Sequence, residues 1–408
     1  MNGLEPATTP SQDPPRVHGL LLVLVVALLL PSSGSQAATS AVPVLQTNLV
    51  SPWIQLAPPM PLSPGSNTPP ALLQPQTNAP THSLLLLTQP DPAKPPPFSW
   101  PTQRLRGSVV PIRDFVTHFG GGELVRLTQG PDPSYELRSG KGRLSLQVSS
   151  TRASLLGVQV ALSQVPQLQG GELWLNRFDL QNTIHPILWT TQQVAVAHTG
   201  CVMLDPGHGG RDVGTTSVDG RSYEKNHTLD WAMRLRALLE RQGWRVLLTR
   251  TNDTDVSLAQ RVYLAEEAKV DLFISLHFNS APSQTSRRGL ETYALTPPGM
   301  LSTVVRDSED NPRLHFPNNR YDLPNFLLAW DIQKATIPAT SATDRGVQRA
   351  RFMGVLRGQN RPAVLVEGGY LSHPEESRRI ADPHYRQKLA EGIANALKTW
   401  ELPSSDPH

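Results

Sequence analysis

The chain has 408 residues, enough for more than one domain, and a formal net charge of +3. This charge is too small to indicate a nucleic-acid partner, although the sequence pI of about 9.1 suits contact with an anionic polymer. With a single cysteine, Cys201, the sequence excludes a disulfide framework and a metal site built from several thiolates.

The N-terminal 38 residues have the pattern of a secretory signal peptide. Their apolar run from residue 20 to residue 30 is too short to cross a bilayer of about 30 Å as a helix. Small residues follow, and Ala37 or Ala38 precedes the expected cut. A retained anchor is the alternative. In both cases we expect the functional part to be exported, to the periplasm or the cell envelope.

Residues 39–104 are rich in Pro, Ser, Thr, Gln and Asn, a composition that favours a disordered linker over a packed core. From residue 105 to residue 190 the pattern changes to a short amphipathic segment and alternating apolar runs, typical of half-buried strands. We therefore predict a small α+β domain over 105–190. It contains no cluster of catalytic residue types, so we expect this domain to have a binding or structural role.

Residues 198–402 alternate between strand-like and helix-like segments, which predicts an α/β fold with a mostly parallel sheet and helices on both faces. In such sheets ligands bind beyond the carboxyl ends of the strands. We expect strands at 201–205, 244–249, 271–277, 289–295 and 362–366, and helices at 225–242, 258–268, 326–337, 345–356 and 385–400.

Two histidines and two glutamates of this region stand in short polar phrases next to apolar runs. His208 lies in a Gly-rich turn, Glu224 at the start of a helix, and His277 at the end of a strand. A catalytic zinc takes three protein ligands and leaves one position for water, so these residues are candidate Zn²⁺ ligands. Glu367 is then free to move protons in the hydrolysis of an amide bond.

Two further residues are candidates for supporting roles. Asp205 precedes His208 by three positions and could orient a ligand, and Asn279 could position substrate or water. The competing interpretations are that His227 is a rival ligand and that Glu367 is a buried carboxylate paired with Arg361. Each residue is unconvincing by itself, and their conjunction carries the prediction.

The stretch from Cys201 to Trp400 closely resembles the catalytic domain of zinc-dependent N-acetylmuramoyl-L-alanine amidases of the Amidase_3 type. The resemblance rests on four motifs in family order: LDPGHGGRDVG, YEKNHTLDWAMRLRALLERQGWRVLLTR, LAQRVYLAEEAKVDLFISLHFNSA and RPAVLVEGGYLSHPEE. It implies that His208, Glu224 and His277 bind Zn²⁺ and that Glu367 is the catalytic glutamate. It also implies that the substrate is peptidoglycan, cut between N-acetylmuramic acid and L-alanine.

Residues 105–190 resemble a small module found before some bacterial cell-wall hydrolases, similar to the N-terminal domain of copper amine oxidases. The resemblance rests on the phrases VPIRDF and LWLNRF. It implies an accessory domain, which could target the cell wall.

The sequence departs from the amidase pattern in two places. The family commonly has Asn where this chain has His373, so we expect altered substrate contacts at most. Residues 296–325 form a longer, Pro- and Asn-rich stretch, which we interpret as a loop over the site and not as an inserted helix.

Two other functions remain open at this point. A zinc peptidase that cuts within the stem peptide would use the same site, because both enzymes break an amide. A cell-wall binding protein without turnover is the second alternative. We expect peptidoglycan as the partner, a monomer, and possible control by a protein activator, with no nucleic acid.

Overall fold

The computed structural model of the protein describes residues 108–119, 121–189, 199–306, 310–398 and 400. The predicted signal peptide and Pro-rich linker lie outside the described residues. Within the described ranges, none of the helices combines the length and the apolar character needed to cross a membrane.

The first part of the described chain consists of short strands and helices. Five consecutive strands pair antiparallel, each with the next: β2 (Glu123–Arg126), β3 (Ser134–Ser139), β4 (Gly142–Gln147), β5 (Arg152–Leu155) and β6 (Val158–Ala161). A smaller sheet joins β1 (Val109–Pro111), β8 (Glu172–Asn176) and β7 (Gln167–Gln169). The helices are α1 (Ile112–Phe119), α2 (Arg177–Asp179), the π-helix η2 (Leu180–Ile184) and α3 (His185–Leu188). The boundaries and the accessory role of this part stay predictions.

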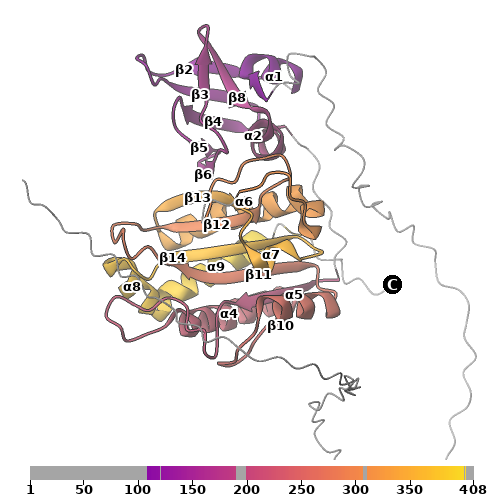
Figure 1. The fold of residues 1–408 in the computed structure, drawn as a ribbon, viewed down its shortest axis with the longest axis vertical. Helices are drawn as coiled ribbons and strands as arrows, with labels where there is room; N and C mark the ends of the chain where they lie inside the picture. The colour runs from indigo at the N-terminus through magenta and orange to yellow at the C-terminus, as the bar shows by residue number, and fades with distance from the viewer. Residues whose placement is uncertain (1–107, 120, 190–198, 307–309, 399, 401–408) are drawn as a thin grey trace, which may run out of the picture. The chain divides into compact units, whose positions relative to one another are not determined.

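The second part is an α/β domain in which helices pack on a sheet (Figure 1). Its strands are β9 (Cys201–Pro206), β10 (Arg245–Leu248), β11 (Leu272–Asn279), β12 (Leu290–Leu295), β13 (Asp344–Ala350) and β14 (Ala363–Tyr370), in the order β10-β9-β11-β14-β12-β13. The first four in this order pair in parallel, and β12 runs antiparallel to β14 but parallel to β13.

The reversal at β12 follows from the connection that precedes it. Parallel neighbours need a long crossover, usually a helix, whereas residues 280–289 join β11 to β12 without a helix. The amino end of β12 therefore lies at the edge of the sheet where β11 and β14 end. This places Glu291, near the start of β12, opposite Glu367 of β14.

Helices cover both faces of this sheet. One face packs on α4 (Glu224–Arg241), α6 (Asp322–Thr340) and α9 (Pro383–Leu397), and the other on α5 (Leu258–Glu267) and α7 (Gly354–Arg357). Alternate residues of β9 pack into the two hydrophobic cores, one on each face of the sheet. Val202 and Leu204 pack in the cluster that contains Trp231 of α4, whereas Met203 packs in the cluster that contains Ala265 of α5.

The predicted helix at 345–356 is wrong. Its first half is strand β13, which pairs with β12, and only the short α7 follows. Gly346 has a φ of +87° and approaches the neighbouring backbone closely, a conformation that interrupts a helix. The spacing of arginines and small apolar residues there imitated an amphipathic helix.

Two helical segments near the site also differ from the prediction. Helix α8 (Pro374–Ala381) was not predicted, and α6 begins at Asp322 rather than at residue 326. Just before α6, the 3₁₀ helix η3 (Pro317–Tyr321) forms within the Pro-rich stretch. His373 is the N-cap of α8, where its side chain accepts a hydrogen bond from the backbone N–H of Glu376. A capping function, which Asn also performs well, therefore accounts for this position.

Candidate metal centre

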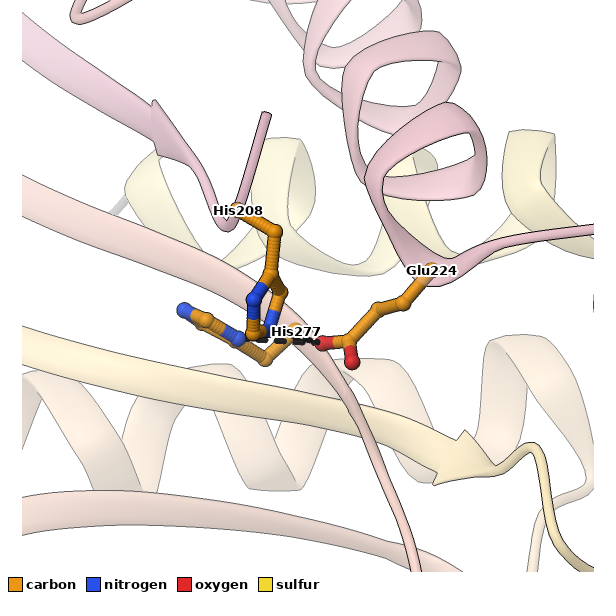
Figure 2. Close-up of side chains that lie close together, drawn as sticks. All are labelled: His208, Glu224 and His277. Carbon is orange, nitrogen blue, oxygen red and sulfur yellow. Dashed lines mark hydrogen bonds and ion pairs between the residues drawn. The ribbon is translucent and has the colours of Figure 1, made fainter. Parts of the chain in front are cut away.

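Three side chains from separate elements converge at the carboxyl edge of the sheet. His208 lies in the turn after β9, Glu224 is the first residue of α4, and His277 belongs to β11. Glu224 Oε1 is 3.1 Å from His208 Nε2 and 3.0 Å from His277 Nδ1. Each residue offers one donor atom, and these atoms lie within 4.8 Å of one another. Figure 2 shows the three side chains gathered at one place from their separate elements. Two imidazole nitrogens and one carboxylate oxygen form a donor set that zinc prefers.

The turn that carries His208 has an unusual backbone that buried arginines hold in place. His208 has a φ of +62°, in the left-handed region that non-glycine residues seldom adopt. Arg250 donates to the carbonyl oxygens of Pro206 at 3.0 Å and Gly207 at 2.8 Å, and Arg261 donates to that of His208 at 2.8 Å. These bonds satisfy the carbonyls of the turn and fix the position from which the imidazole projects.

The ring of His208 is oriented by Asp212. Its Nδ1 is 2.9 Å from Asp212 Oδ2, which leaves Nε2 directed at Glu224. A carboxylate on the second ring nitrogen is the usual partner of a metal-binding imidazole. Sequence reasoning missed Asp212, although its position four residues after His208 in the same Gly-rich turn was a usable signal.

Asp205, which we considered for that orienting role, has other partners. Its buried carboxylate accepts hydrogen bonds from Arg261 Nη1 and Thr249 Oγ1, both at 2.6 Å, and from Ser275 Oγ at 2.7 Å. The carboxylate of Asp205 therefore contacts the His208 turn indirectly, because Arg261 donates both to Asp205 and to the carbonyl oxygen of His208. The carboxylate positions the arginine and not the imidazole.

Glycine is required where the turn meets the ligands. A Cβ on Gly207 would lie 2.2 Å from Cε1 of His277. A Cβ on Gly214 would lie 2.7 Å from both Oε2 of Glu224 and Cδ2 of His208. The Gly-rich phrase thus lets backbone pack directly against the side chains of all three candidate ligands.

Glu224 is held as an anion between the two imidazoles. Burial alone would raise its pKa, but the hydrogen bonds with His208 and His277 outweigh burial and keep the pKa of this carboxyl well below its usual range. The backbone N–H groups of Phe278 and Thr215 also donate to the carboxylate, each at 2.9 Å. A buried anion between two nitrogen donors fits a divalent cation.

Glu367 lies beside this donor set. It is opposite His277 in the parallel β11–β14 ladder and opposite Glu291 in the antiparallel β12–β14 ladder. It is 7% exposed, and its Oε2 is buried without a hydrogen-bond partner among the described residues. Burial, followed by the negative charges of Glu224 and Glu291, raises the pKa of Glu367 well above its usual value.

Glu291 is a buried carboxylate that sequence reasoning did not single out. It accepts hydrogen bonds from Asn279 Nδ2 at 2.7 Å and from the Tyr370 hydroxyl at 2.8 Å, and Arg345 Nε lies 3.1 Å away. The side chain of Asn279 is therefore fixed by Glu291. The available signal was a charged residue inside the otherwise apolar run of β12, since a buried charge needs partners.

The two residues that offered competing interpretations, His227 and Arg361, have other partners in the structure. His227 lies outside the donor set: its Nε2 is 2.9 Å from Ser222 Oγ, and its Nδ1 faces Arg386 Nη1 at 3.3 Å. Arg361 pairs with Glu266, so it does not neutralise Glu367.

A cavity of about 440 Å³ opens beside the two histidines. The start of α5 forms much of its wall, and its lining includes His208, His277, Asp212, Leu258, Arg261 and Val355. A larger hollow of about 630 Å³, lined by residues such as Val262 and Phe316, contains none of the candidate site residues. The chemistry of the lining, and not the volume, identifies the smaller cavity as the place where a substrate would bind.

Comparison with known proteins points to one family. The family model described as N-acetylmuramoyl-L-alanine amidase matches residues 202–399. N-acetylmuramoyl-L-alanine amidase AmiA of Salmonella typhimurium is 33% identical over 220 residues, which cover 49% of this chain and 75% of the relative. The probable cell wall amidase LytH of Staphylococcus aureus USA300 is 34% identical over 200 residues, which cover 49% and 57%.

Solved structures were also matched. The catalytic domain of CwlV, an N-acetylmuramoyl-L-alanine amidase from Bacillus (Paenibacillus) polymyxa var. colistinus, is 31% identical and has a TM-score of 0.40. The match covers 48% of this chain and 96% of that structure.

Proposed function

This chain belongs to the N-acetylmuramoyl-L-alanine amidase family, and we propose that it acts by a zinc-dependent mechanism. The reaction is hydrolysis of the amide between the lactyl group of N-acetylmuramic acid and the L-alanine of the stem peptide. The observation that carries the proposal is the convergence of His208, Glu224 and His277 beside Glu367, whose buried Oε2 has no hydrogen-bond partner in the part of the chain that the structure describes. The biological role would be cell-wall remodelling or the separation of daughter cells.

The donor set fits zinc in the number and the chemistry of its atoms. His208, Glu224 and His277 would hold the ion, and Asp212 would keep the first imidazole in the orientation that presents Nε2. A bound zinc supplies a Lewis acid and an acidified water, which are the two requirements for attack on an amide at neutral pH.

Glu367 is the proton carrier of this proposal. Its unpartnered oxygen is free to accept a proton from water as the water oxygen bonds to the amide carbonyl carbon. The same proton then passes to the nitrogen of alanine as the carbon–nitrogen bond breaks, which yields a muramic acid carboxylate and a peptide with a free amine. The raised pKa of Glu367 makes its carboxylate a stronger base for the first step, because a carboxyl group that is too acidic would not take up the proton of the water.

The remaining expectations follow from the substrate. Peptidoglycan lies outside the cytoplasm, so we propose that the chain is exported to the periplasm or cell envelope and that residues 1–38 direct the export. The relatives named as cell wall amidases support an envelope location. Control by a protein activator and a monomeric state remain expectations.

The test is identification of the bond that is cut. The full chain is incubated with purified peptidoglycan, with and without a zinc chelator, and the soluble products are identified by mass spectrometry. We expect chelator-sensitive release of stem peptides that begin with a free L-alanine amine. Fragments cut within the stem peptide would instead identify a zinc peptidase. Wall binding without zinc or release would identify a binding protein.

A further inference from the structure

The cavity beside the two histidines extends to one side of the candidate site. Its lining residues come from β9 and the turn after it, from β11, from residues 255–261 at the start of α5 and from Val355 of α7. In the described part of the chain, none of them belongs to β14, the strand of Glu367. Because β11 stands between β9 and β14, the cavity extends from His277 toward β9, whereas Glu367 lies toward β14.

This arrangement gives the amide a direction in the proposed reaction. Glu367 returns its proton to the alanine nitrogen, so the peptide side of the amide would face β14. The lactyl group is bonded to the carbonyl carbon on the side away from that nitrogen, and it would therefore face the cavity. A volume of about 440 Å³ is within the range of small-molecule sites, so the cavity has room for the lactyl group and the sugar ring that carries it.

Leu258, the first residue of α5, presents an apolar side chain to this cavity. It is 58% exposed although it lines the cavity together with both histidines. A capping box fixes its helical turn: Ser257 Oγ accepts from the backbone N–H of Gln260 at 3.2 Å, and Gln260 Oε1 accepts from that of Ser257 at 2.8 Å. Helix α7 supports the side chain, because a Cβ on Gly354 would lie 2.9 Å from Cδ1 of Leu258.

Polar side chains of the same wall bind groups of the protein. Arg261 donates to the carboxylate of Asp205 at 2.6 Å, and Arg211 pairs with Asp255 at 2.7 Å. The apolar side chains of the lining are those of Val256, Leu258 and Val355. Leu258 is the most exposed of the three, so it offers the largest apolar contact to a substrate in the cavity.

We propose that Leu258 is a specificity-determining residue that contacts the methyl group of the lactyl ether. This inference rests on the proposed function, because the assignment of the proton carrier gives the amide its direction. The lactyl group carries one methyl, on the carbon next to the carbonyl that is attacked. Burial of this methyl against Leu258 makes the enzyme favour a lactyl ether over a glycolyl ether, which lacks only that methyl.

The test compares the full chain on three disaccharides. The first carries N-acetylmuramic acid linked to L-alanyl-D-isoglutamine, the second has a glycolyl ether in place of the lactyl ether, and the third has glycine in place of L-alanine. We expect the wild type to prefer the first over the second by about tenfold in kcat/KM, the scale of one methyl-sized group in an apolar pocket.

Variants of Leu258 should change this preference without unfolding the protein, because the side chain is largely exposed. Leu258→Ala should reduce the preference to less than about twofold, chiefly by raising KM for the lactyl compound, and Leu258→Met, of similar volume, should keep most of it. The matched control is Leu264→Ala, on the same helix but outside the cavity lining. Thermal unfolding of each variant accompanies the kinetics.

Two kinetic outcomes would overturn the inference. One is a Leu258→Ala protein that keeps the full preference for the lactyl ether. The other is a Leu258→Ala protein that loses its preference for L-alanine over glycine and not its preference for the lactyl ether, because the cavity would then hold the peptide side of the amide.

Binding measured without turnover separates this inference from the proposed function. The lactyl and glycolyl compounds are titrated by calorimetry into the Glu367→Gln protein and into the same protein with Leu258→Ala. Tighter binding of the lactyl compound that disappears with Leu258 supports the contact even if the wild type cuts neither compound. Equal binding of the two compounds by the Glu367→Gln protein would overturn it.

Discussion

Replacing Glu367 with Gln tests the assignment of the proton carrier directly. The change keeps the shape of the side chain but removes its ability to accept and return a proton. General acid–base catalysis contributes about 100- to 10,000-fold to a rate, so we expect a loss of that size in kcat. This corresponds to about 3–5 kcal/mol of transition-state stabilisation.

The same structure predicts that the substitution leaves the fold and the metal site intact. Oε2 of Glu367 has no hydrogen-bond partner among the described residues, so the amide that replaces the carboxyl group breaks no bond at that atom. Glu367 is also the carboxyl group with a raised pKa, and a neutral amide suits its buried surroundings. We expect the free energy of unfolding to change by less than about 1 kcal/mol.

The assay therefore needs three readings on each protein: zinc per chain by atomic emission, thermal unfolding, and the initial rate of stem-peptide release. The matched control is Glu375→Gln, which removes an exposed carboxylate on α8 that lies 3.4 Å from Arg288. The control should match the wild type in all three readings. A Glu367→Gln protein that hydrolyses at a near-normal rate would refute the role of Glu367, and one that loses its zinc would make Glu367 a ligand.

Three further predictions concern the candidate ligands, the carboxylate that orients one of them, and the buried His227. Gly207→Ala should lower zinc affinity by about tenfold or more, because the new Cβ displaces the ring of His277, and competition with a chromophoric chelator measures this. Gly140→Ala is the control, since a Cβ there meets nothing within 4 Å. Asp212→Ala should weaken zinc binding about 10- to 100-fold at little cost in stability, because it removes the carboxylate that orients the first imidazole, and the same competition assay checks this. Burial, followed by the charge of a neighbouring guanidinium, lowers the pKa of His227 from 6.5 to about 4. The unfolded chain then binds more protons between these values, so stability should fall as the pH drops from about 6.5 to about 4, and the melting temperature of His227→Gln should fall less over that range.

Much of the α/β domain could be predicted because the spacing of apolar residues in its strands and helices is regular. The strands β9, β11 and β14 are apolar runs, and α4 has helical spacing closed by Gly243. The register could not be predicted, since it depends on which strands pair. The reversal at β12, and with it the position of Glu291 opposite Glu367, emerges only when the antiparallel ladder is known.

The candidate site likewise has one part that the sequence indicates and another that depends on tertiary structure. His208, Glu224 and His277 could be predicted because they stand next to strand ends or at a helix start, and three such donors indicate a metal. Their supporting residues come from elsewhere in the chain. Arg250 lies just past β10 and still holds the turn before His208, a contact that only the parallel pairing of β10 with β9 brings about. Local sequence thus predicts the candidate ligands, whereas tertiary pairing determines what orients them.

The environments of three neighbouring carboxylates assign them different roles. Glu291 is paired with Arg345 and accepts two neutral hydrogen bonds, so its charge is already compensated. Glu224 lies between two imidazoles and is suited to donate an oxygen to a cation. Glu367 has neither type of partner at its Oε2, and the other two negative charges disfavour its ionisation. When environments push the pKa values of adjacent carboxyl groups apart, the group with the raised value is the one suited to carry a proton near neutral pH. We therefore propose that the division of labour between ligand, support and proton carrier follows from the partners that β11, β13, β14 and the turn after β9 provide.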